Sequence, residues 1–578
     1  MRPFLSLAAA LAFVIVARAD TKDPLRFFPE TTDIVVKVEK PRLLAESVLK
    51  HDLAKEAMQL QVVRDFLDNA TYRRFFQLVA HFEHELGSPW PELIDKLAGG
   101  GMALGAKFSG DNNAPVVIAV QGTDEKTVTK FFNLAVSLLE EERTRQGAGE
   151  PMKHKSYEGF DGVELDKDAI AAHKGDVILF SNKGEALKSA IDHYTKVQKD
   201  PKTKTVATIA NKQSSSILPA GPAAWLWLNL KPIKELPQIK DLFEMPRANF
   251  ILTFVAAGQL DVARRSDFLT IGLYADKGDF RVAVRMPAGR DGMATDVELH
   301  LPKDPKIGGT LPLLEPQGVL ASHSFYLDLD TMYKKREQIF PPDIAKGFAE
   351  GEQQISRFLI NSSLPEFLSQ SGVHYRLVAA RHETVPDYKT EPEIKLPAFA
   401  AVISMRNPKF AKTMSALIHA GSAALAQQVS YKSWDEEIAG VPAFGYTFRE
   451  GGKFPDDPQN LHLNYQPTFG AYKDQYILAS NKGLFKELVG ILEKEDRTRP
   501  MSQNMQARAY ASGAGDFAGT AAEAALASTI VGQALKVGDA RKQTEALFKF
   551  LPKLGTVGIE TDYTANEFRL DITWKTKK

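Results

Sequence analysis

The sequence predicts an α+β protein made of two homologous units in tandem, each a mainly antiparallel sheet with helices packed on one face. Segments such as 33–39 and 224–230 alternate apolar and polar residues, as half-buried strands do. Segments 127–142 and 412–428 carry apolar residues at spacings of three and four, which is typical of amphipathic helices. A short turn at 276–279 separates two strand-like runs, which favours antiparallel pairing.

The first residues have the features of a secretory signal peptide. Arg2 supplies a positive charge, residues 3–16 are almost wholly apolar, and Ala17 and Ala19 are small residues before a cleavage site. The apolar run is shorter than the roughly 20 residues that span a bilayer. We therefore expect cleavage before Asp20 and a periplasmic or extracellular protein with no transmembrane segment in the mature chain.

Composition favours a folded protein with a large core. Hydrophobic residues make up 44% and charged residues 25% of the 578-residue chain, close to the averages for globular proteins. The 72 basic and 72 acidic residues cancel, and no long block of one sign is present, so nucleic acid is not an expected partner. Because the chain has no cysteine, disulfides and thiolate metal sites are excluded.

Internal similarity predicts the domain organisation. The matches occur in the same order in both halves of the chain: residues 91–94 with 365–368, Ala119 with Ala401, Gly159 with Gly440, and Ser181 with Ser480. Prolines and paired glycines after position 301 are typical of a linker. The predicted organisation is a signal peptide (1–19), a first α+β unit (20–301), a linker (302–310) and a second α+β unit (311–578).

Both halves contain the sequence Ser-Asn-Lys-Gly between a predicted strand and a predicted helix, namely Ser181, Asn182, Lys183 and Gly184, and Ser480, Asn481, Lys482 and Gly483. A lysine at a helix N-terminus is a candidate anion site, because free N–H groups and the helix dipole attract negative charge. The pattern is not a P-loop, since lysine precedes the glycine and no hydroxyl follows it. The alternative interpretation is a strand-to-helix turn in which Asn182 and Asn481 are N-caps.

His81 and His84 lie one helical turn apart and are the candidate metal ligands. Their order with Glu83 and Glu85 matches neither known zinc-helix pattern, and the second half has no counterpart. A polar helix face is the better interpretation, so we expect neither a metal nor another cofactor.

We find no catalytic motif. The sequence has no Gly-x-Ser-x-Gly nucleophile elbow, and the glycines at 99–101 follow a predicted helix and precede a strand, which reverses the order of a dinucleotide-binding loop. The sequence therefore predicts a protein that is not an enzyme.

The segments at 114–135, 157–165, 176–194 and 214–230 resemble a family of exported bacterial proteins with a domain of unknown function. Its members show a similar strand, then an S-x-x-x-A-L-K-x-A-I helix and a proline-led strand. The resemblance covers most of the first unit and, more loosely, the second. It implies a location in the cell envelope or outside the cell and no assigned activity.

Three functions are consistent with these observations. The first is a non-enzymatic protein of the cell envelope or exterior with a binding or assembly role toward an unknown protein partner. The second is a carrier of a lipid or another apolar ligand, because a curved sheet with helices can enclose a pocket. The third is a hydrolase whose site is assembled from distant residues.

Overall fold

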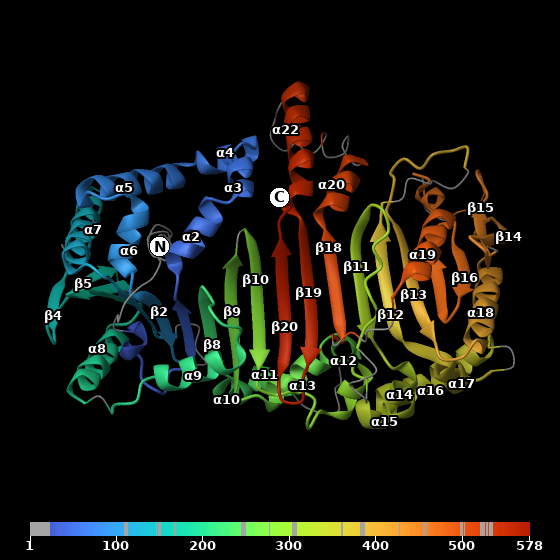
Figure 1. Ribbon diagram of the computed structural model, residues 1–578, viewed down its shortest axis with the longest axis horizontal. Helices are drawn as coiled ribbons and strands as arrows, with labels where there is room; N and C mark the ends of the chain where they lie inside the picture. Colours follow the sequence, from blue (N-terminus) through green and yellow to red (C-terminus); the bar gives the residue numbers. More distant parts are fainter. Residues whose placement is uncertain are drawn as a thin grey trace. The chain divides into compact units, whose positions relative to one another are not determined.

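The computed structural model of the chain is shown in Figure 1. It describes residues 23–108, 114–145, 147, 152–166, 169–200, 202–243, 250–276, 278–302, 309–359, 362–381, 388–426, 428–452, 454, 457, 459–496, 501, 503–520, 526, 530 and 536–577. The predicted signal peptide lies outside the described residues, as does most of the predicted linker. Helices and antiparallel strands are mixed throughout, which confirms the α+β class.

The chain divides into two compact units. Unit 1 comprises Met1–Lys240 and Arg265–Pro287, and unit 2 comprises Asp241–Arg264 and Ala288–Lys578. This division differs from the predicted boundary near 301 because the intervening residues pack within unit 2. Leu299, for example, lies in a core cluster with Leu327 and Met332.

The sheet of unit 1 is antiparallel throughout. Its strands are paired in the order β4-β5-β6-β7-β3-β2-β1-β8-β9-β10. Their bounds are β1 (Ile34–Val38), β2 (Gly101–Ala106), β3 (Val116–Gln121), β4 (His154–Tyr157), β5 (Phe160–Asp166), β6 (Ala169–Lys174), β7 (Val177–Ser181), β8 (Ala224–Asn229), β9 (Phe268–Asp276) and β10 (Asp279–Met286).

The sheet of unit 2 has the same order with every index raised by ten: β14-β15-β16-β17-β13-β12-β11-β18-β19-β20. Its strands are β11 (Val319–Tyr326), β12 (Ser371–Ala380), β13 (Ala398–Met405), β14 (Tyr431–Ile438), β15 (Val441–Phe448), β16 (Thr468–Tyr472), β17 (Gln475–Ala479), β18 (Met505–Tyr510), β19 (Thr556–Tyr563) and β20 (Phe568–Lys575). A shared order is what a duplicated fold produces, and common ancestry of the units stays a prediction.

The helices occupy corresponding places between the strands. Unit 1 contains η1 (Pro24–Phe27), α2 (Pro41–Leu49), α3 (Asp52–Ala57), α4 (Gln61–Leu67), α5 (Ala70–Leu86), α6 (Trp90–Ala98), α7 (Glu125–Arg145), α8 (Gly184–Lys199), α9 (Ala207–Ile217), α10 (Leu230–Lys234) and the start of α11 (Pro237–Phe243). Unit 2 contains α12 (Phe250–Val255), α13 (Ala257–Arg265), η2 (Thr295–Leu299), α14 (Leu329–Lys334), α15 (Arg336–Ile339), α16 (Pro342–Ser356), α17 (Leu364–Gln370), α18 (Lys409–Leu425), η4 (Leu461–Asn464), α19 (Lys482–Lys494), α20 (Ala511–Thr520), α22 (Val537–Phe550) and η5 (Leu551–Leu554).

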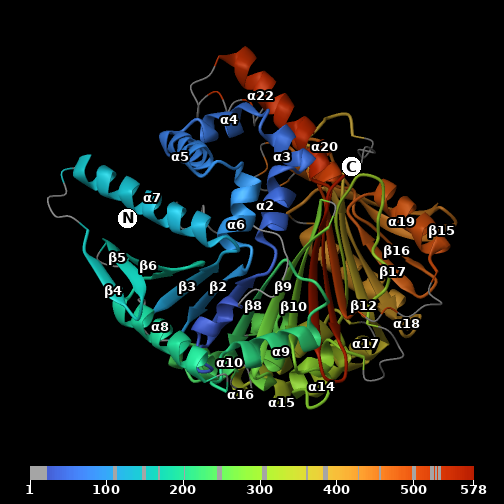
Figure 2. The ribbon, with the colours of Figure 1, turned by 60° about the vertical axis from the view of Figure 1, so that its left-hand side comes forward.

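Helices cover both faces of the sheet in unit 1, so the prediction of helices on one face is wrong. In β3, Val117 packs in the core cluster that contains Leu187 of α8, whereas Val120 packs in the cluster that contains Phe131 of α7. Figure 2 shows α7 and α8 on opposite sides of β4 to β7. The physical reason is that β3 is apolar at successive residues, so each face needs a covering helix.

The two faces of unit 2 are covered unequally. On one face, α19 buries Leu484 and Leu488 against β13 and β17. On the other face lies α18, whose buried residues comprise Phe410 alone among those described. Phe410 packs edge-on against Tyr476 of β17, with 6.1 Å between ring centroids. The contact holds one end of α18 on the sheet and leaves the rest of the helix less tightly packed.

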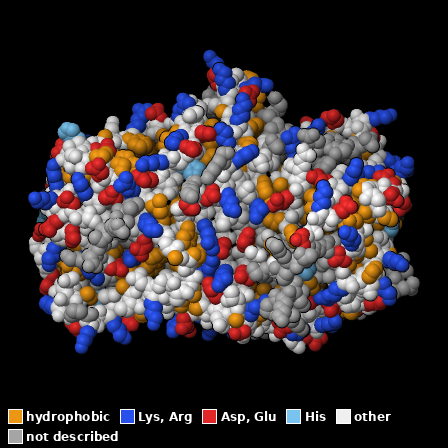
Figure 3. Space-filling view, viewed as in Figure 1, with side chains coloured by type: hydrophobic (Ala, Val, Ile, Leu, Met, Phe, Trp, Pro, Cys, Tyr) orange, Lys and Arg blue, Asp and Glu red, His pale blue; other side chains and the backbone are white. Residues whose placement is uncertain are grey.

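Charged side chains of both signs are interspersed on the face shown in Figure 3. Among the described residues, no helix is both long and apolar enough to cross a membrane.

Candidate functional site

In unit 1, Ser181 and Asn182 of the Ser-Asn-Lys-Gly sequence form hydrogen bonds that join the end of β7 to the start of β3. The Asn182 Oδ1 accepts from the Val116 N–H at 2.8 Å, and its Nδ2 donates to the Ala114 carbonyl at 2.8 Å. The Ser181 hydroxyl donates to the Val116 carbonyl at 2.8 Å. Asn182 is therefore not the N-cap that we predicted. That position is Lys183, which makes no side-chain capping bond, and Gly184 begins α8.

In unit 2 the asparagine does cap the helix, as predicted. The Leu484 N–H donates to Asn481 Oδ1 at 2.8 Å, and α19 begins at Lys482. The Lys482 ammonium forms an ion pair with Glu436 and lies 3.9 Å from the centre of the Trp434 ring. The lysine that we considered for an anion site is therefore already paired with groups of the protein. Gly483 is the next residue of the helix.

Strand register shows that the repeated sequence is displaced by one residue between the units. Ser181 is the last residue of β7 and pairs with Val117, whereas the last residue of β17 is Ala479, which pairs with Ala400. Ser480 therefore corresponds to Asn182, not to Ser181 as aligned from the sequence. The side-chain bonds agree, because Ser480 Oγ accepts from the Phe399 N–H at 2.9 Å, as Asn182 Oδ1 does from Val116.

The two histidines considered as metal ligands both lie on α5. The His84 imidazole contacts its neighbour Glu85 at 3.2 Å, and His81 Nε2 has no hydrogen-bond partner. The described residues contain no group of three or more histidine, aspartate or glutamate side chains placed to hold a metal ion.

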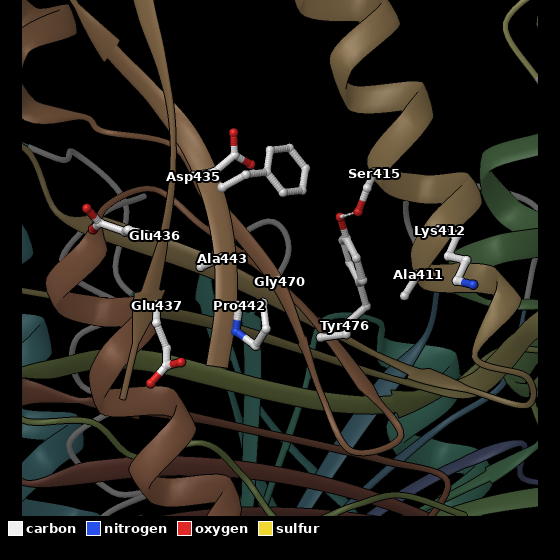
Figure 4. A pocket seen from close by; sticks show the side chains of 12 residues that line it. Ala411, Lys412, Ser415, Asp435, Glu436, Glu437, Pro442, Ala443, Gly470 and Tyr476 are labelled. Carbon is white, nitrogen blue, oxygen red and sulfur yellow. Dashed lines mark hydrogen bonds between the residues drawn. The ribbon is translucent and has the colours of Figure 1, made fainter. Parts of the chain in front are cut away.

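A cavity of about 600 Å³ lies in unit 2 between α18 and the sheet, and sequence analysis did not find it. Figure 4 shows its labelled side chains, from α18 on one side and from β14 to β17 on the other. The lining residues are Ala411, Lys412, Ser415, Asp435, Glu436, Glu437, Pro442, Ala443, Phe444, Gly470, Ala471 and Tyr476. Small and apolar residues predominate on the sheet side, so the interior suits an apolar group.

The inner end of the cavity is closed by Tyr476, whose exposed fraction is 0%. Its hydroxyl lies 2.9 Å from the Ser415 hydroxyl of α18. Burial raises the pKa of Tyr476 to about 12, so the phenol is neutral at physiological pH. The outer end is formed by the exposed residues Asp435, Glu437 and Lys412.

The corresponding place in unit 1 is filled by two rings. Phe132 of α7 stacks on His173 of β6, with 5.2 Å between ring centroids and 23° between planes. His173 pairs with Ile178 next to the β6–β7 turn, and Ala471 pairs with Tyr476 at the same place in unit 2. Alanine thus stands in unit 2 where unit 1 has histidine.

On the helix, Phe132 follows Asp124 by the same number of residues as Ser415 follows Asn407. Asp124 and Asn407 are equivalent markers, since each accepts a backbone N–H near the start of its helix. Serine therefore stands in unit 2 where unit 1 has phenylalanine. The loss of both rings accounts for the open space between α18 and the sheet.

A second cavity, of about 520 Å³, lies in unit 1 beside α8 and is polar. The Tyr157 hydroxyl donates to Asp192 at 2.7 Å, and Lys188 pairs with Glu185 at 3.2 Å. Because these groups already bind one another, this cavity is a weaker candidate site.

No protein-family model matches the chain, and no curated protein matches it. Among solved structures, the chain is similar to three crystal forms of TP0453. Form I is 8% identical, with a TM-score of 0.25, over 48% of this chain and 84% of that chain. The values are 9%, 0.26, 48% and 85% for form III, and 7%, 0.23, 46% and 80% for form IV. We transfer no property of TP0453 to this chain from a similarity of this size.

Proposed function

We propose that this chain is an exported, non-enzymatic binding protein that holds an apolar ligand in the cavity of unit 2. One observation carries the proposal: the space that Phe132 and His173 fill in unit 1 is open in unit 2, where Ser415 and Ala471 take their places. A well-packed protein loses dispersion contacts around an empty space, so a ligand in the cavity would restore them.

The polar groups of the cavity support binding rather than catalysis. The Ser415 hydroxyl contacts the Tyr476 phenol, which stays protonated at neutral pH and so cannot take the serine proton. Farther along α18, the Ser422 hydroxyl donates to the phenol of Tyr446, which in turn lies 3.1 Å from Nδ1 of His419. A hydrolase needs a serine next to a group that takes its proton, and Ser415, which lines the cavity, contacts a protonated phenol instead.

Transplanting the unit 1 residues tests the cavity. The triple variant Ser415→Phe/Ala471→His/Tyr476→Ile copies Phe132, His173 and Ile178 and should fill the space without disturbing the sheet. N-phenyl-1-naphthylamine, a neutral apolar dye, should bind the mature protein saturably and should bind the triple variant at least about tenfold more weakly. Circular dichroism checks that the variant is folded.

A single variant, Ala471→Leu, provides a second way to fill the cavity if the triple variant misfolds. Glu493→Gln, on the exposed side of α19, is the matched control and should leave dye binding unchanged. Equal dye binding by the wild type and both filled variants would place the dye elsewhere and overturn the proposal. Absence of saturable binding to the wild type would do the same.

Export is the part of the proposal that rests on sequence. The charged and apolar residues before Ala19 support it. Sequencing of the N-terminus of the protein recovered outside the cytoplasm should give Asp20. Recovery of a chain that still begins at Met1 from the cytoplasm would contradict export and leave the cavity proposal standing.

A further inference from the structure

We propose that the ligand of this cavity is an apolar molecule with a positively charged amino group, which Asp435 and Glu437 bind at the outer end. The inference rests on the proposed function, since it concerns the same cavity. The apolar part of such a ligand matches the apolar interior of the cavity, and its positive charge matches the acidic entrance.

Strand geometry places both carboxylates at the entrance. Asp435 and Glu437 are separated by one residue on β14, and side chains at alternate positions of a strand point to the same face. Both line the cavity, opposite Ser415 and Lys412 of α18 in Figure 4. The intervening Glu436, which is also among the lining residues, forms an ion pair with Lys482 of α19, the helix on the other face of the sheet.

Neither entrance carboxylate is neutralised by the protein. In the part of the chain that the structure describes, Asp435 and Glu437 have no ion-pair partner, and both are exposed. Neighbouring carboxylates repel one another, and a cation between them relieves that repulsion. An anionic head group would meet the same charges unfavourably.

An aromatic ring lies beside one of the carboxylates. Phe444 of β15 pairs directly with Asp435 in the strand register and also lines the cavity. The face of an aromatic ring attracts a cation when that face is free. One face of the Phe444 ring is stacked on His419 of α18, with 4.3 Å between ring centroids, so the ring contributes apolar surface beside Asp435 and selection of an amine rests on the two carboxylates.

The corresponding strand of unit 1 lacks this arrangement. His154 pairs with Val163 in β4–β5 as Asp435 pairs with Phe444, and Ser156 stands where unit 2 has Glu437. His154 is itself bonded to Glu140 of α7 at 3.0 Å. The β4 positions that correspond to Asp435 and Glu437 are thus not acidic in unit 1, where the nearby Asp161 of β5 accepts from the Ser156 hydroxyl at 3.1 Å.

Lys412 fixes the direction in which the ligand lies. It belongs to α18 and lines the cavity across from β14, so a positive head group is repelled from α18 and attracted to β14. The apolar part then points toward Ala471 and the buried Tyr476.

Three ligands of equal chain length separate charge from apolar binding: octylammonium, 1-octanol and octanoate. Each is titrated against the full mature protein by displacement of N-phenyl-1-naphthylamine at neutral pH. Octylammonium should bind roughly three- to tenfold more tightly than 1-octanol, since each exposed ion pair contributes a modest amount. Octanoate should bind most weakly, and the preference for the amine should shrink as salt is added.

The variant Asp435→Asn/Glu437→Gln should bring the affinity for octylammonium down to that for 1-octanol and leave 1-octanol binding unchanged. Phe444→Leu, which keeps the site apolar and both carboxylates, should leave the preference for octylammonium over 1-octanol in place. The control Glu493→Gln removes one negative charge from unit 2 away from the cavity and should keep the preference. The two single variants Asp435→Asn and Glu437→Gln replace the double variant if it does not fold.

Equal affinities for the three ligands, or a preference for octylammonium that survives loss of both carboxylates, would overturn this inference. Binding of 1-octanol that the cavity-filling variants abolish would still uphold the proposed function. If none of the ligands displaces dye and the dye itself does not bind saturably, the proposed function fails as well.

Discussion

The hydroxyl groups of Ser415 and Tyr476 lie 2.9 Å apart at the closed end of the unit 2 cavity. The bond joins α18 to β17 by polar contact, whereas α7 and β6 of unit 1 are joined by the stacked rings of Phe132 and His173. A hydrogen bond holds a helix near a sheet without filling the space around it. Two units with one strand order thus differ in how their equivalent helices are packed.

Truncation of Phe132 should therefore cost more stability than truncation of Ser415. Phe132→Ala leaves a cavity in the core of unit 1 and should lower the free energy of unfolding by about 3–5 kcal/mol. Ser415→Ala removes one hydrogen bond and should cost about 1 kcal/mol. Urea denaturation followed by tryptophan fluorescence measures both. Similar losses in the two variants would contradict the packing difference.

Tyr476 should make the protein less stable at alkaline pH. An unfolded tyrosine ionises near pH 10, whereas burial raises the pKa of Tyr476 to about 12. Between these values the unfolded chain loses a proton that the folded chain keeps, so stability falls as pH rises through that range and is unaffected below it. Near pH 11 the phenol should lower stability by on the order of 1 kcal/mol.

Comparison with Tyr476→Phe isolates this contribution, because other buried tyrosines with raised pKa values, such as Tyr326 and Tyr388, remain in both proteins. The variant loses the bond to Ser415 at every pH, so it should be less stable at neutral pH and should lose less on going to alkaline pH. A parallel loss in both proteins would mean that Tyr476 ionises in the folded state.

The sequence predicted the α+β class and the order of matched segments, because strand alternation, helix periodicity and turns are local signals. It did not reveal the cavity, because the alignment of the two halves was wrong by one position in each of two segments. The alignment of Ala119 with Ala401 sets Phe132 against Met414, and the alignment of Ser181 with Ser480 sets His173 against Tyr472. Large residues are then compared with large residues.

Strand pairing corrects each alignment by one position and sets Phe132 against Ser415 and His173 against Ala471. A slip of one residue turns every strand side chain to the other face, so it exchanges the face covered by α18 for the face covered by α19. The residues that differ between the units are present in the sequence, but only the strand register shows which residues are equivalent. Likewise, Asp435 and Glu437 can be placed at the cavity entrance only once the structure shows that α18 covers their face of the sheet.

The buried ion pair of unit 2 should be sensitive to loss of either partner. The side chain of Arg376 of β12 is 1% exposed and that of Glu495, just after α19, is 4% exposed, and the two side chains bond to each other. Arg376 also donates to Gln475 at 2.8 Å. Glu495→Ala removes one member of this buried ion pair and should cost about 3–5 kcal/mol.

The double variant Arg376→Met/Glu495→Leu should be more stable than either single variant, because replacement of both charges removes the desolvation penalty as well as the attraction. Chemical denaturation of the four proteins gives the coupling energy. Additive losses in the double variant would show that the two side chains do not depend on each other.

The asparagines of the repeated Ser-Asn-Lys-Gly sequence should differ in how much stability is lost on replacement by aspartate. Asn481 acts only as an acceptor for the Leu484 N–H at the start of α19. Aspartate accepts the same bond and adds a negative charge at the positive end of the helix, which offsets part of the cost of burying a carboxylate at a residue that is 4% exposed, so Asn481→Asp should be less destabilising than Asn182→Asp. Asn182 also donates to the Ala114 carbonyl, and a carboxylate there would lose that bond and face the carbonyl oxygen.

Asn182→Asp should therefore destabilise the protein by about 1–3 kcal/mol, while Asn481→Ala, which removes the cap, should cost about 1 kcal/mol. Urea denaturation of the three variants beside the wild type tests this difference between the two halves of the chain. The different roles follow from the one-residue displacement between the units, since the position of Asn182 is taken by Ser480 in unit 2. If both aspartate variants were destabilised equally, the two asparagines would have the same role and the register deduced from strand pairing would be wrong.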